Sequence, residues 1–180
     1  MTQLNLIYDD FLSRITDDMY MELTPEQTMG MLFKLLRQAI PWFEFPKTSL
    51  EFVEENTGEI VIVTSDHPAN EDRLCIEGDL TIEEIGIIAT YMVVAWLGQQ
   101  LANIDLVRQH YTGADFKLTS QASHLQRVSK LKKDYEDQGF HLQRLYSRRK
   151  KENGQIKSTM GMIMESSTGG FNEIKTRYTD

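Results

Sequence analysis

The stretch that decides the fold is Thr81–Leu97, which reads TIEEIGIIATYMVVAWL. Thr81 followed three residues later by Glu84 is a capping box, a pattern that begins helices. Apolar residues then cover most of the helix circumference, which is typical of a helix buried on several sides. The apolar run is about 13 residues long, and a membrane-spanning helix needs about 20. We therefore expect a core helix that extends to about His110 and is central to a bundle.

Three more segments show the apolar spacing of helices. Residues 3–20 carry one apolar stripe. Thr24, Pro25 and Gln27 form a second capping box with proline at the first helical position, so a helix should begin there and end before Pro41. A last long helix is expected at about 120–150, where Gly139 should weaken or bend it. An aromatic group after the second helix should plug the core rather than stack a ligand: Trp42, Phe43 and Phe45.

Residues 48–78 change in character and predict a small β insertion between helices. Leu50–Val53 and Glu59–Thr64 have the composition of strands, and Glu54–Gly58 between them is a hairpin turn. We expect a short third strand at Arg73–Ile76.

With 180 residues, the chain is long enough for one domain with an appendage. The expected fold class is mainly α: a bundle of about four helices with a small β-hairpin insertion and an extended C-terminal tail. The helical domain covers 1–151, with the β insertion at about 48–78, and 152–180 form the arm. The arm is too rich in Gly, Ser and Thr to fold alone, so its apolar residues should become ordered on a partner: Met160, Met162, Ile163, Met164 and Phe171.

Charge is divided unequally along the chain. Residues 1–116 contain 6 Lys and Arg against 20 Asp and Glu, whereas residues 117–180 contain 13 against 7. This division fits a solvated helix face, or a surface for nucleic acid or an acidic protein patch. Acidic and basic faces of neighbouring copies would also fit in a head-to-tail ring. The candidate interface residues of the basic part are Lys130, Lys132, Lys133, Arg144, Arg148, Arg149, Lys150 and Lys151.

The sequence carries no pattern typical of catalysis. No two of its four histidines stand three or four residues apart, and its one cysteine, Cys75, excludes a disulfide framework. Phosphate-binding Gly loops, Rossmann fingerprints and nucleophile elbows are missing from the sequence. We expect no enzyme activity, no catalytic residue, no metal and no cofactor. A metal-dependent hydrolase built on Asp9, Asp10, Asp17 and Asp18 is a distant alternative.

Several longer stretches resemble one group of proteins. YTGADF at 111–116 leads through TSQASHL at 119–125 to LYSRRK at 145–150, and WLGQQ at 96–100 precedes them. The opening YDDFLSRITDDMY at 8–20 is similar too. Together they resemble small structural proteins of tailed bacteriophages of Gram-positive hosts, which lie in the neck between portal and tail.

The resemblance implies a head-to-tail connector, or adaptor. Such proteins are mainly helical and assemble as rings, commonly of twelve copies, below the portal. They extend the DNA channel and give the tail a docking surface. Expected partners are further copies of the chain, the portal, other neck or tail proteins and the DNA in the channel. The 152–180 arm is the candidate for portal or subunit contact, and the β insertion for contact with the next ring.

The N-terminus has no basic region and no small-residue cleavage site, which argues against a secretory signal. We expect a soluble protein that is made in the host cytoplasm, has no membrane partner and resides in the virion neck.

The main alternative is a DNA-binding packaging or regulatory module that uses the basic helix 120–151 on phosphates. Against it, helix-turn-helix spacing is not evident and the formal net charge of the chain is −8.

Overall fold

The computed structural model describes residues 1–15, 23–63, 73–110, 118–152 and 155–158, with side chains described in 1–15, 23–63, 73–103 and 123–149. These residues contain four α-helices: α1 (Leu4–Leu12), α3 (Pro25–Ala39), α4 (Ile82–His110) and α5 (Leu118–Ser147). A 3-10 turn, η1 (Ile40–Trp42), follows α3. The strands are β1 (Thr2–Gln3), β2 (Phe52–Glu54), β3 (Leu74–Ile76), β4 (Arg149–Glu152) and β5 (Gln155–Ser158). The protein is mainly helical with a small antiparallel sheet, which confirms the coarse fold prediction.

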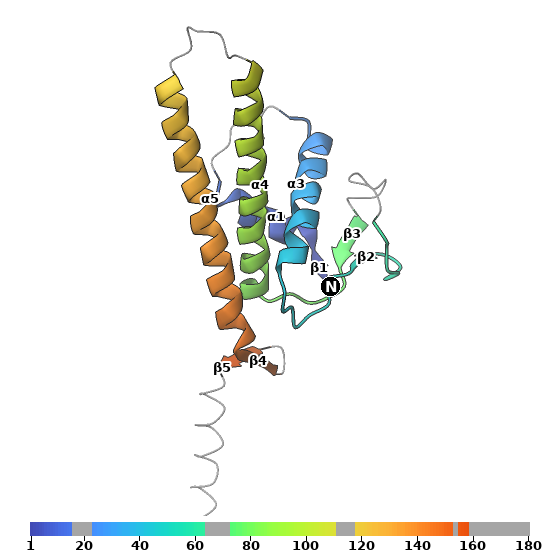
Figure 1. Cartoon of the computed structure of the whole chain (residues 1–180). Helices are drawn as coiled ribbons and strands as arrows, with labels where there is room; N and C mark the ends of the chain where they lie inside the picture. Colours follow the sequence, from blue (N-terminus) through green and yellow to red (C-terminus); the bar gives the residue numbers. More distant parts are fainter. Residues whose placement is uncertain (16–22, 64–72, 111–117, 153–154, 159–180) are drawn as a thin grey trace, which may run out of the picture.

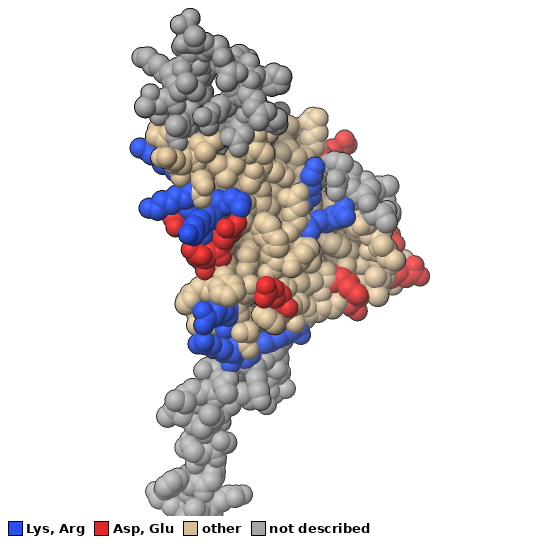
Figure 2. Space-filling view, viewed as in Figure 1, with Lys and Arg blue, Asp and Glu red and all other residues tan. Residues whose placement is uncertain are grey.

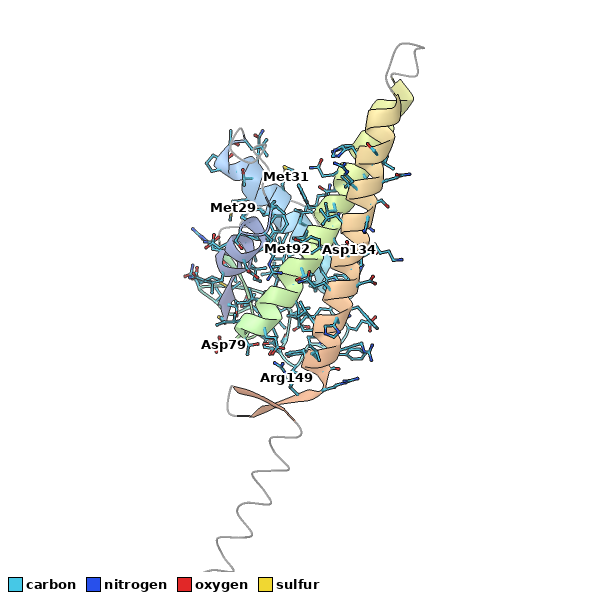
Figure 3. All side chains as sticks on the ribbon, turned by 90° about the vertical axis from the view of Figure 1, so that its left-hand side faces the viewer. Met29, Met31, Asp79, Met92, Asp134 and Arg149 are labelled. Carbon is cyan, nitrogen blue, oxygen red and sulfur yellow. The ribbon has the colours of Figure 1, made fainter. Side chains whose placement is uncertain are left out.

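Helix α4 lies at the centre of the molecule. It packs against α1, α3 and α5, and every residue from Ile87 to Ala95 is buried. Figure 1 shows α5 on one flank of the bundle, α4 and α3 next to it, and the sheet of β1, β2 and β3 on the opposite flank. Figure 3 places Met92 of α4 among the helices of the core. The central position that its apolar circumference predicted is therefore confirmed.

The segment Ile82–Asn103 of α4 is long and apolar enough to cross a membrane, by length and composition alone. In this fold 56% of its most apolar window is buried inside the molecule. Burial against the other helices accounts for that apolar character, because a core helix needs the same residues.

Both capping boxes are present. The Gln27 N–H donates to Thr24 Oγ1 at 3.4 Å, and the Thr24 N–H donates to Gln27 Oε1 at 3.2 Å. The Thr81 N–H donates to Glu84 Oε2 at 2.8 Å, and the Glu84 N–H to Thr81 Oγ1 at 3.3 Å. Each box satisfies backbone donors that a helix start leaves without a helical partner.

The three-stranded sheet has the order β1-β3-β2 and is antiparallel. Val53 stands opposite Cys75, and Thr2 stands opposite Ile76. After the turn, where Gly58 has a φ of +67°, the chain returns beside β2 through one bridge between Val53 and Ile60. The predicted strand 59–64 is thus reduced, in the described residues 59–63, to a short bridged segment.

Three further expectations differ from the structure. Residue 3 belongs to β1, and the first helix runs only from Leu4 to Leu12, so residues 13–15 are not helical; its predicted part 16–20 lies outside the described residues. Of the aromatic group only Phe43 is buried, since Trp42 and Phe45 are exposed. Helix α5 ends at Ser147 and gives way to the β4–β5 hairpin. The boundary expected at residue 151 therefore falls inside a strand.

Candidate functional site

A polar cluster joins the end of α5 to the start of α4, at the foot of the bundle. We call it the base clasp and define it by five residues: Lys47, Thr48, Glu84, Tyr146 and Arg149. They come from the loop after η1, the first turn of α4, the last turn of α5 and the first residue of β4. Figure 3 shows Arg149 at the foot of α5. The cluster thus brings together residues up to 102 positions apart in the sequence.

Glu84 is the centre of the base clasp and is fully buried. Its Oε1 accepts hydrogen bonds from Thr48 Oγ1 at 2.8 Å and from the Tyr146 hydroxyl at 2.5 Å. Its Oε2 accepts from the N–H and Oγ1 of Thr81 at 2.8 and 2.9 Å. Burial acts to raise the pKa of Glu84, but these hydrogen bonds outweigh it and lower the pKa below the ordinary value. Glu84 is therefore a buried, ionised carboxylate.

Tyr146 and Lys47 complete the cluster. Burial and the hydrogen bond to Glu84 raise the pKa of Tyr146, so the phenol stays protonated and donates. The Lys47 ammonium lies 4.2 Å from the centre of the Tyr146 ring and donates to the carbonyl oxygens of Tyr146, at 2.5 Å, and Arg149. Burial lowers the pKa of Lys47, against the opposing effect of the nearby Glu83 and Glu84 carboxylates. Lys47 thus caps the end of α5 with positive charge.

Two more contacts hold the same end of α5. Arg149 Nη1 lies 2.9 Å from both carboxylate oxygens of Glu83 in the first turn of α4. One turn earlier, Gln143 donates to the Tyr91 hydroxyl at 2.8 Å and accepts from the Glu44 N–H at 3.1 Å. Because every named partner belongs to the fold itself, this arrangement positions α5 and the hairpin that follows it.

The sequence pattern predicted local roles for single residues of the base clasp but did not predict that they come together. Glu84 is predicted as a capping residue and Tyr146 lies in the predicted last helix, and neither signal predicts that the two side chains meet. Lys47 carries no local signal at all, because its role depends on carbonyl groups 99 and 102 residues away.

The predicted basic residues fall into two groups along α5 and its end, with carboxylates between them, as Figure 2 shows. Lys130 and Lys133 are exposed in the first group, where Lys132 pairs with Glu136 at 2.5 Å. In the second group Arg144 is exposed and lies 5.7 Å from the Phe140 ring, Arg148 is exposed, and Arg149 belongs to the base clasp. Lys150 and Lys151 lie in β4, and only their backbone is described.

The remaining candidates are not brought together into a site. Met160, Met162, Ile163, Met164 and Phe171 lie outside the described residues. Asp10 pairs with Arg14 at 2.8 Å and Asp9 is exposed, while Asp17 and Asp18 lie outside the described residues. In the part of the chain whose side chains are described, no three His, Cys, Asp or Glu side chains gather in a group able to hold a metal ion.

The hollows on the surface of the described residues include the following two. A shallow one of about 130 Å³ lies between α1, α3 and the sheet, with Cys75, Glu55 and Met29 in its wall. Burial, with the Glu55 charge in addition, raises the pKa of Cys75, so the group is a thiol rather than a reactive thiolate. The other, an open groove of about 390 Å³, lies between α3 and α4 beside Met31 and Gln99.

Neither a family model, nor a curated protein, nor a solved structure matches this chain.

Proposed function

We propose that this chain is a structural virion protein that forms a ring between portal and tail, as a head-to-tail connector. In this role it extends the DNA channel and docks the tail. The observation that supports the proposal best is the unequal charge of opposite flanks of the bundle: α5 carries an excess of Lys and Arg, and the sheet an excess of Glu. The residue resemblance to phage neck proteins supports the same reading.

The basic flank is α5, whose outward side chains include Lys130, Lys133 and Arg144. The acidic flank is the sheet, where Glu51, Glu55 and Glu59 are exposed. Figures 1 and 2 show that the two flanks face away from each other across α4 and α3. Surfaces of opposite sign on opposite sides of one subunit favour head-to-tail contacts, which close into a ring when the rotation allows.

The base clasp gives the proposal a second support, because it fixes how the chain leaves the bundle. It fixes the end of α5 and therefore the direction in which the chain leaves the bundle toward the 152–180 arm. A fixed direction lowers the entropy that is lost when such an arm binds a portal or a neighbouring subunit.

The test is the mass and shape of the native species, from a phage particle or after mixing with a cognate portal. Native mass spectrometry or electron microscopy should show a closed ring of a defined number of copies, with twelve expected from the resemblance. A protein that stays monomeric or dimeric both with and without portal would contradict the proposal and favour the DNA-binding module.

A further inference from the structure

The outer edge of the three-stranded sheet is an apolar segment with open backbone groups. Residues 59–63 are tied to β2 by two hydrogen bonds, from the Val61 N–H to the Phe52 carbonyl at 2.8 Å and from the Glu54 N–H to the Glu59 carbonyl at 3.0 Å. In an antiparallel pair the residues between such bonds direct their N–H and C=O groups away from the partner strand. Ile60 lies between these two bonds and therefore presents its N–H and C=O groups on the edge of the sheet.

The side chains of this segment also point in two directions. Val61 and Val63 pack against the core, whereas Ile60 is 59% exposed and Ile62 is 84% exposed. An exposed run of β-branched residues at an open edge is a template for the addition of another strand. Three exposed glutamates flank β2 and this segment: Glu51 before β2, Glu55 after it, where its carboxylate accepts from Gln3 Nε2 at 3.2 Å, and Glu59 next to Ile60. The edge thus fits an extended partner that carries positive charge.

The β4–β5 hairpin of the same chain is extended and positively charged, as a partner of this edge should be. Its two strands contain Arg149, Lys150, Lys151 and Lys157 against one carboxylate, Glu152. The register sets Lys150 directly opposite Lys157, and like charges at opposite positions destabilise a strand pair. A two-stranded hairpin is only marginally stable alone, so an acidic third strand would stabilise it twice, by pairing and by charge.

We propose that the edge formed by Ile60 and Ile62 binds the β4–β5 hairpin of a second copy of this chain. The hairpin lies at the foot of α5 and the edge lies on the sheet flank, so the two are different surfaces of one molecule (Figure 1). A contact between different surfaces leaves one of each unoccupied in a pair and repeats from copy to copy. The inference rests on the proposed function and names the contact that joins the subunits of the ring.

Charge exchange between two variants tests the contact. One variant carries Glu51→Lys, Glu55→Lys and Glu59→Lys, and the other carries Lys150→Glu, Lys151→Glu and Lys157→Glu. In sedimentation velocity on the full chain, each variant alone should self-associate at least about tenfold more weakly than the wild type, because like charges then meet. An equimolar mixture should recover association, because each changed surface then meets its complement on the other variant.

The controls separate the edge from general effects of charge. Asp9→Lys, Asp134→Lys and Asp137→Lys change the same number of exposed carboxylates elsewhere and should leave association intact. Ile62→Lys should weaken association, whereas Ile82→Lys, at an isoleucine that is 90% exposed on α4, should not. Hydrogen exchange at the amides of Ile60 and Ile62 should slow in the assembled protein.

The outcomes distinguish this contact from the proposed function. If the wild type assembles and both charge-exchanged variants also assemble alone, or their mixture does not recover, the contact is wrong and the ring is held elsewhere. If the wild type is monomeric alone but forms a ring with portal, the variants are compared in that ring, and a ring formed with portal by either variant alone overturns the contact while the connector function stands. If it forms no ring under either condition, both proposals fail.

Discussion

Glu84 shows how one buried residue determines the arrangement of three elements. Its carboxylate receives donors from the loop after η1, from the start of α4 and from the end of α5. A buried charge is stable only where its hydrogen bonds replace those lost from water. Loss of any donor therefore leaves the charge under-satisfied, and the effect should be larger than for an exposed hydrogen bond.

Tyr146→Phe is expected to lower the free energy of unfolding by about 1–3 kcal/mol, because it removes the hydroxyl that donates to Glu84 and leaves the ring in place. Urea denaturation followed by circular dichroism measures the change. Tyr135→Phe, at a half-buried tyrosine about three turns earlier on α5, is the matched control and should be close to neutral. Equal effects of the two substitutions would show that the hydrogen bond to Glu84 contributes little.

The same carboxylate predicts a pH dependence with a definite sign. The folded protein lowers the pKa of Glu84, so its contribution to stability is complete above the ordinary value of 4.5 and is lost as the pH falls through the lower folded-state pKa. Glu84→Gln should therefore reduce the decline in the free energy of unfolding on acidification, as well as lowering stability at pH 7. Denaturation series from neutral to acidic pH compare the variant with the wild type, and parallel curves would exclude this role.

At the scale of elements, the sequence predicted those features that depend only on residues close by in the chain. The capping boxes at Thr24 and Thr81 were found because their partners lie three residues away. Strand β1 was missed because its partner Ile76 lies 74 residues from Thr2, and two residues carry no periodicity. Trp42 was expected inside, but its position beyond the last turn of α3 leaves it partly exposed beside the Tyr91 ring, 5.9 Å away. Such outcomes depend on packing between elements, which local pattern does not report.

Gly139 illustrates the same point, because the side chain that requires a glycine at this position lies on another helix, α4. A Cβ at this position would lie 2.9 Å from Tyr91 Cε1, whose ring is held by Gln143, so α5 remains continuous through the glycine and packs closely on α4. Gly139→Ala should therefore destabilise the protein by about 1–3 kcal/mol, although alanine favours helices. Gly98→Ala in α4 is the matched control, since its Cβ would meet only Lys132 Cε at an ordinary 3.6 Å. It should be neutral or stabilise by up to about 1 kcal/mol, and thermal unfolding compares the two.

On the scale of the whole molecule, the buried core formed by the described side chains lies before the hairpin. The buried hydrophobic residues run from Leu4 to Tyr146, and Arg149 closes the base clasp. A chain truncated after residue 151 should therefore keep a cooperative thermal transition and its helical circular dichroism. It should also fail to assemble, because the hairpin is interrupted and the arm is missing. Loss of the cooperative transition would show that the residues beyond 151 belong to the core.

The distribution of charge also bears on the DNA-binding alternative. Asp134 and Asp137 are exposed beside Lys130 and Lys133, and Lys132 is paired with Glu136. These carboxylates weaken the field that phosphates would meet. We expect duplex DNA to bind weakly even at low salt, with a shallow dependence of affinity on salt in fluorescence anisotropy. A steep dependence at physiological salt would instead favour a DNA-binding module.

The base clasp holds α5 firmly at one end only, its C-terminal foot. The described residues of α5 that are buried, Gly139, Gln143 and Tyr146, all belong to its final third, whereas residues 123–134 are at most partly buried. The free energy of local opening should therefore be lowest at the far end of α5 and highest at its foot. Amide hydrogen exchange should slow progressively from the far end to the foot. A force applied to the hairpin passes through Tyr146 and Arg149 directly into the first turn of α4. A force applied at the far end would instead break the packing of α5 on α4 one helical turn after another.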